Sequence, residues 1–175
     1  MVSWKGGLLL LAVLAGLAVY ALVSRPGPAP AQASFVPCNV VKAVYFRIQG
    51  VDRTVELQRT TPTAPWRLLQ PAPSEVDANR VTTIVNAMDV IRVQNTISKP
   101  GPDSQYGLAP AREVLTCRLS DGSSYNLSVG SQSFDGSGYY ARKGGDNRVF
   151  VISSIEVQQF DQALADPPVK PTPSP

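Results

Sequence analysis

Hydrophobic residues follow three patterns along this chain, and each pattern predicts a different kind of element. The first is an apolar segment from Gly6 to Val23, which carries no charge over 18 residues. A helix of that length is about 27 Å long at ~1.5 Å per residue, close to the ~30 Å hydrocarbon core of a membrane. It predicts an N-terminal transmembrane anchor over residues 1–25. The other two patterns, period-2 alternation and helical spacing, predict a folded domain after it.

The apolar segment has a second interpretation as a cleaved signal peptide. An A-x-A pattern, Ala31-Gln32-Ala33, precedes Ser34 and would suit a cleavage site. However, the segment is longer than the usual signal-peptide core of about 7–15 residues. Trp4 and Tyr20 near its two ends suit the two membrane interfaces. We therefore favour an uncleaved anchor.

Alternation predicts three strands at the start of the domain. Residues 40–49 and 54–60 alternate apolar and polar positions around the turn at Gly50, which predicts a hairpin. Trp66 to Leu69 is a short apolar segment between prolines and predicts a third strand.

A helix is predicted next. Ser74 with Asp77 three residues later resembles a capping box, which predicts the helix start. Residues 90–97 then predict a strand or an extended exit from the helix. The apolar stripe of the helix consists of Val81, Ile84, Val85 and Met88.

The second half of the domain repeats this plan. Residues 113–119 and 125–129 predict one hairpin, and residues 138–143 and 148–152 predict another. Ser153 to Glu156 is an S-x-x-E capping box that opens a final helix. The order of elements predicts an α+β fold of two similar halves, each a small antiparallel sheet covered by one helix.

Proline-rich segments bound this domain on both sides. Residues 26–36 predict a semi-rigid spacer, and residues 37–165 form the predicted α+β domain. Residues 166–175 carry five prolines and predict a disordered tail.

Charge argues against a nucleic-acid partner. The chain has 16 Lys plus Arg and 13 Asp plus Glu, but Lys5 and Arg25 flank the apolar segment, so the chain from Ser34 onward carries only +1. Its charges are scattered singly, whereas a nucleic-acid binder gathers basic residues on one face. We expect no nucleic-acid partner.

The sequence contains no catalytic or metal-binding set. It has no histidine, the commonest general base and metal ligand, and no Ser in a G-x-S-x-G elbow. Catalysis by a pair of carboxylates remains an alternative, although the sequence around the acidic residues does not single out any two of them. We expect no enzymatic activity, no cofactor and no metal.

Two groups of residues are candidate sites. Cys38 and Cys117 both fall on the apolar parity of their strands and are candidates for a disulfide bond; the alternative is two buried free thiols. The other group is an aromatic and basic interaction patch on the last hairpin, although alternation puts its two tyrosines on opposite faces. Its residues are Tyr139, Tyr140, Arg142, Lys143 and Arg148.

Several short motifs, in their order and spacing, resemble one bacterial family. They are Trp66-Arg67-Leu68 with Pro71, Tyr106-Gly107-Leu108-Ala109-Pro110, Leu119-Ser120-Asp121-Gly122, Leu127 to Gly130, Gly138-Tyr139-Tyr140-Ala141-Arg142 and Val149 to Ile152. Over residues 40–165 the chain resembles the family called domain of unknown function 4340. The resemblance implies a membrane-anchored extracytoplasmic module, of a kind often associated with export or gliding-type ABC transporters, and it supplies no catalytic residue.

These observations give an expected location and role. The amino terminus is expected in the cytoplasm and the domain on the extracytoplasmic, periplasmic side of the cell membrane, held by a single pass. Two cysteines without a metal motif are compatible with an oxidising compartment. We expect a non-enzymatic protein-interaction or accessory subunit of a membrane or envelope complex. The alternative is a domain that binds a small molecule or cell-wall polymer, or a hydrolase acting on one.

Overall fold

The computed structural model describes residue 20 and residues 34–171 of the chain. The predicted anchor, apart from Tyr20, and the spacer as far as Ala33 therefore lie outside the described residues. Among the residues that are described, no helix is both long and apolar enough to cross a membrane. The segment from Ser34 onward forms one compact unit.

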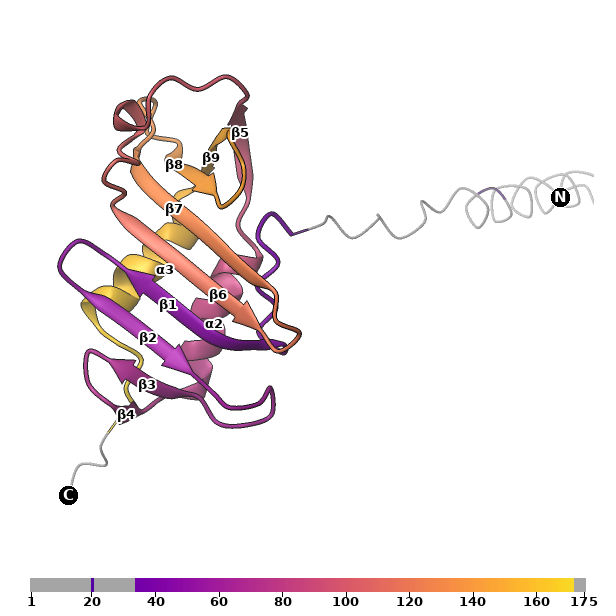
Figure 1. Cartoon of the computed structure of the whole chain (residues 1–175), viewed down its shortest axis with the longest axis vertical. Helices are drawn as coiled ribbons and strands as arrows, with labels where there is room; N and C mark the ends of the chain where they lie inside the picture. Colours follow the sequence, from indigo (N-terminus) through magenta and orange to yellow (C-terminus); the bar gives the residue numbers. More distant parts are fainter. Residues whose placement is uncertain (1–19, 21–33, 172–175) are drawn as a thin grey trace, which may run out of the picture. The chain divides into compact units, whose positions relative to one another are not determined.

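The described strands form one antiparallel sheet of nine strands, in the order β4-β3-β2-β1-β6-β7-β8-β9-β5 (Figure 1). Together with the helices this confirms the α+β class. Two separate small sheets were expected; instead the first strands of the two halves pair directly, with Phe46 opposite Cys117 and Ile48 opposite Leu115. The strands are β1 (Ala43–Gln49), β2 (Thr54–Gln58), β3 (Arg67–Gln70), β4 (Ser74–Glu75), β5 (Val93–Ile97), β6 (Glu113–Leu119), β7 (Ser124–Gln132), β8 (Gly138–Lys143) and β9 (Val149–Ser153).

The chain runs outward from the centre of the sheet twice. From β1 it passes through β2 and β3 to β4 and then into α2 (Ala78–Asp89); from β6 it passes through β7 and β8 to β9 and then into α3 (Ser154–Ala165). After α2, β5 pairs with β9 at one edge. After α3, Val169 pairs with Val76 beside β4 at the other edge. Each edge is thus completed by the segment that follows the helix of the opposite half.

Both helices lie on the same face of the sheet and pack against each other (Figure 1). The strands turn alternate side chains toward them, among them Phe46, Leu57 and Leu115, which are fully buried. The helices contribute Met88 and Phe160 to the same core. Burying each such side chain stabilises the fold by about 1.5–3 kcal/mol, so this layer is the main source of stability.

The helix starts differ in detail from the sequence prediction. Ser74 and Glu75 form the short strand β4, and Asp77 is itself the N-cap of α2, accepting hydrogen bonds from the amides of Asn79 (2.9 Å) and Arg80 (3.2 Å). The predicted start at Ser74 is therefore wrong by one turn, because Ser74 is used to pair with Leu68.

The predicted start of α3 at Ser153 is confirmed. Its side chain accepts a hydrogen bond from the amide of Ile155 at 3.3 Å. Glu156 is buried, and its carboxylate faces Arg92 at 3.5 Å.

Both predicted domain boundaries need correction. The last residues of the predicted spacer belong to the fold, because Val36 is fully buried and the ring of Phe35 packs edge-on against Phe150 at 4.7 Å. The predicted disordered tail is ordered as far as it is described. The Pro168 carbonyl accepts from the Asp77 amide and the Lys170 amide donates to Glu75, each at 3.0 Å. A proline has no backbone N–H, but its carbonyl can still accept a hydrogen bond at the edge of a sheet. Residues 172–175 lie outside the described part.

Candidate functional site

The structure joins Cys38 and Cys117 by a disulfide bond. Their Cα atoms are 6.0 Å apart, and both residues are fully buried among the apolar side chains beneath the helices. The bond ties the segment before β1 to the centre of β6. It spans 79 positions of sequence and links the two halves of the sheet covalently.

The predicted aromatic and basic patch is divided between the two faces of the sheet. Tyr139 packs against the core, with the Arg112 guanidinium 4.8 Å from the centre of its ring. Tyr140 meets Tyr106 edge-on at 5.0 Å, and Arg142 forms an ion pair with Asp103 at 2.7 Å.

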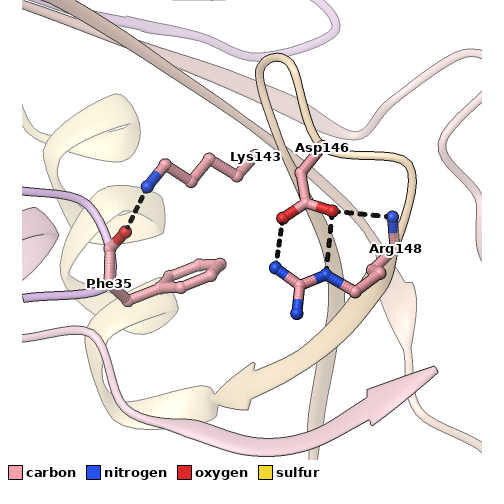
Figure 2. A network of polar contacts seen from close by, with 4 residues as sticks. All are labelled: Phe35, Lys143, Asp146 and Arg148. Carbon is pink, nitrogen blue, oxygen red and sulfur yellow. Dashed lines mark hydrogen bonds and ion pairs between the residues drawn. The ribbon is translucent and has the colours of Figure 1, made fainter. Parts of the chain in front are cut away.

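The remaining two cations of the predicted patch are held by the chain itself (Figure 2). Lys143 donates a hydrogen bond to the carbonyl of Phe35 at 3.0 Å. Arg148 forms a bidentate pair with Asp146, with donor–acceptor distances of 3.0 and 2.7 Å. The five residues therefore do not form a single surface, and their cations already have partners.

A different cluster gathers ionisable groups at the start of β6. The guanidinium of Arg112 donates to the carboxylates of Glu113, at 3.2 Å, and of Asp161 on α3. Glu113 is only 2% exposed, and its second oxygen has no hydrogen-bond partner among the described residues. Such a group is costly to bury ionised, so it holds its proton unusually firmly.

The pKa values of the Glu113 and Asp161 carboxyl groups are shifted in opposite directions. Burial, the hydrogen bond to Asp161 and the charge of Asp161 raise the pKa of Glu113 to about 8. Burial also acts to raise the pKa of Asp161, but hydrogen bonds from Arg112 and Glu113 outweigh it and leave that pKa below its ordinary value. One proton shared by two carboxyl groups with separated pKa values is an arrangement seen in acid–base sites and in structural networks alike.

This cluster lines a surface pocket of about 210 Å³. The β1–β2 turn, including Asp52 and Arg53, and Leu164 on α3 complete the lining of the pocket. One feature of the sequence points to this cluster. Glu113 alternates in step with Leu115, Cys117 and Leu119, so an acidic residue occupies a position of the strand that faces the core. Its neighbour Asp161 could not be found from sequence, since only the fold brings α3 to this end of β6.

The second feature missed from sequence is the face of the sheet opposite the helices, which we call the free face. Over β3, β2, β1, β6 and β7 no helix among the described residues covers it (Figure 1). The strand register arranges its side chains in three cross-strand rows. The rows are Arg67–Gln58–Tyr45–Arg118–Ser124, Gln70–Glu56–Arg47–Thr116–Asn126 and Thr54–Gln49–Val114–Ser128–Arg142.

The free face is polar and accessible. None of these side chains is buried, and Gln58, Arg118 and Asn126 are exposed. Serine, threonine, asparagine and glutamine supply hydrogen-bonding groups between the arginines, and Val114 is the only aliphatic side chain in the three rows. Because α2 and α3 both lie on the other side of the sheet, they leave this surface available to a partner.

Comparison with known families places the chain in one of them. A family model described as Domain of unknown function (DUF4340) matches residues 66–167. The chain belongs to this family, and the resemblance inferred from the motifs is confirmed from Trp66 onward. No curated protein matches the chain, and no solved structure does.

The fold explains why one pair of these motifs occurs together. Gly107 adopts a left-handed conformation (φ 63°) after the 3₁₀ helix η1 (Asp103–Tyr106). Gly130 on β7 lies directly against it: a Cβ on Gly130 would be 2.0 Å from the carbonyl oxygen of Tyr106. The two glycines therefore let the loop after β5 contact the backbone of β7, which is a structural role.

Proposed function

We propose that this chain is a single-pass, membrane-anchored extracytoplasmic domain that acts by binding another protein of the membrane or envelope, without catalysing a reaction. The observation that carries the proposal is the free face: a wide polar sheet surface that α2 and α3 leave uncovered. A wide polar sheet surface suits a protein partner better than a small ligand, which is usually held in a concave and mostly apolar pocket.

Two further features support the membrane and compartment parts of the proposal. The uncharged segment from Gly6 to Val23 has the length and composition of a transmembrane helix. The disulfide between Cys38 and Cys117 suits an oxidising compartment such as the periplasm, since such bonds are rare in the cytosol.

The proposal also includes the origin of the domain in two similar halves. Each half is a run of strands leading outward from the centre of the sheet into a helix, and each edge is completed by the segment that follows the other half's helix. This reciprocal arrangement supports a related pair of units, although the sequences of the halves match in pattern only.

Location and attachment can be tested with the full chain. A reporter enzyme that is active only after export, fused after Pro175, should be active, and the chain should stay with membranes after washing at high pH. Mass spectrometry should recover residues before Ser34 in the mature protein. A mature chain that starts at Ser34 would contradict the anchor, and an inactive exported reporter would contradict the orientation.

A second function, hydrolysis or binding of a small molecule or wall polymer, is favoured by one observation. Glu113 and Asp161 form a carboxyl pair with separated pKa values beside a pocket, as an acid–base site would require. The pocket is small, and Arg112 already neutralises the pair. Hydrolysis of envelope polymers by the full chain, lost in Glu113→Gln while folding is kept, would establish this second function instead.

A further inference from the structure

Three of the four arginines in the rows of the free face form no ion pair among the described residues. Among the fifteen side chains in the three rows, Glu56 is the only acid, whereas the arginines include Arg67 on β3, Arg47 on β1 and Arg118 on β6. Beyond the rows, at the edge of the sheet, Glu75 on β4 lies opposite Arg67 and forms an ion pair with Lys170. Within residues 34–171, none of these three arginines takes part in an ion pair. Arg142, the fourth arginine of the rows, is paired with Asp103.

Two of these side chains are restrained by the sheet without forming an ion pair within the described part of the chain. The Arg118 guanidinium stacks on the ring of Tyr45, 3.9 Å from its centre. Arg47 lies opposite Glu56 and Thr116, and its Nε is buried with no hydrogen-bond partner among the described residues. Stacking and partial burial reduce the rotamer entropy that a guanidinium loses when it binds, so these cations are prepared for an anionic partner.

We propose that the free face binds an acidic surface of a partner protein, with Arg47, Arg67 and Arg118 each receiving a carboxylate. This inference rests on the proposed function and names the surface and its chemistry. A guanidinium and a carboxylate form two parallel hydrogen bonds, which gives the contact both energy and direction. The serine, threonine, asparagine and glutamine side chains between the arginines would bind polar groups of the same partner.

The arrangement favours a protein over other polyanions. A membrane surface is bound by clusters of about four to eight adjacent Lys or Arg residues, and nucleic acid requires a continuous basic stripe. Here the arginines alternate with uncharged hydrogen-bonding groups, and the three rows contain no lysine. Arginine and tyrosine are also the residues that protein interfaces favour most.

Site-specific photocrosslinking in the full chain, expressed in its own host, tests this proposal. The crosslinking residue replaces Asn126 on the free face or, as a control, Gln158 on the exposed side of α3. Crosslinking from position 126 is then repeated with Arg67→Glu and Arg118→Glu together, and with Arg148→Glu as a control of charge change, since Arg148 lies over Phe150 and outside the three rows.

We expect position 126 to crosslink one protein through an acid-rich segment, and the double variant to lower the yield at least tenfold. Changing two acids of that segment to lysine should restore the yield with the double variant. Crosslinks from position 158 alone would overturn this inference and leave the proposed function standing. A partner segment without acids, a yield unchanged by the double variant, or crosslinks to lipid alone would also overturn it. No protein crosslink from either position would overturn both proposals.

Discussion

Glu113 on β6 and Asp161 on α3 both accept hydrogen bonds from the guanidinium of Arg112. This relationship joins the sheet to its helical layer through charged groups. It also makes the stability of the fold depend on pH, because only one of the two carboxyl groups ionises easily.

We predict that the free energy of unfolding falls as pH rises from 5 to 8. The pKa of Glu113 is about 8 in the folded chain and about 4.3 when unfolded, so over this window the folded state holds a proton that the unfolded state releases. The stabilisation from this proton is complete below about pH 4.3 and is lost as the pH rises past about 8. The free energy of unfolding therefore falls by at most about 1.4 kcal/mol per pH unit. Urea titrations at a series of pH values measure it.

Glu113→Gln provides the matching variant for this measurement. The amide keeps a donor toward Asp161 but does not titrate, so the slope between pH 5 and 8 should flatten. Glu75→Gln, which removes an exposed acid, should leave the slope as in the original chain. If Glu113→Gln retains the full slope, another group is responsible and the assignment to Glu113 is wrong.

The disulfide predicts a large effect of reduction. Closing a loop across 79 positions stabilises a fold by about 4.5 kcal/mol in the chain-entropy model, so Cys38→Ser with Cys117→Ser should lower the free energy of unfolding by a few kcal/mol. Urea unfolding with and without dithiothreitol measures this. The reductant should destabilise the original chain and leave the double variant unchanged. Equal stability of the oxidised and reduced chains would contradict the prediction.

Close backbone contact at Gly130 predicts that Gly130→Ala destabilises the fold. The new methyl group would lie 2.0 Å from the carbonyl oxygen of Tyr106, so β7 and the loop would have to separate, at a cost of about 1–3 kcal/mol. Thermal unfolding measures the loss. Gly144→Ala is the matched control, because its nearest neighbour would be a Cβ at 3.3 Å. If the two variants lose similar amounts of stability, the close contact at Gly130 is not the cause of the loss.

The elements most easily predicted from sequence are those with their own periodic pattern. Leu115, Cys117 and Leu119 mark a strand, and Val81, Ile84 and Val85 mark a helix, because each alternation reflects burial on one side. Pairing between halves has no such local signal. Phe46 and Cys117 look the same in sequence whether their strands pair with each other or belong to separate sheets.

Sites formed across long distances in sequence were less predictable. The rows of the free face depend on the register of six strands, and Arg67 and Arg118 share a row only because β2 and β1 lie between them. The Glu113 cluster needs α3 in place. Conversely, the residues of the predicted patch do not share one surface, because adjacent residues in a strand point to opposite faces. Its cations also have partners within the chain, namely Asp103, Phe35 and Asp146.

The ordered C-terminal segment gives the last prediction. The amide of Lys170 donates to the Glu75 carbonyl at 3.0 Å, so Lys170→Pro removes the donor and should cost about 1 kcal/mol of unfolding free energy. Loosening of this pairing should also speed hydrogen exchange at the Asp77 amide, which donates to Pro168. Lys170→Ala separates the backbone from the side chain: it keeps the amide and removes only an exposed ion pair with Glu75, so its effect should be below about 0.5 kcal/mol. If Lys170→Pro exchanges and unfolds like Lys170→Ala, the segment adds no stability to the edge of the sheet at β4.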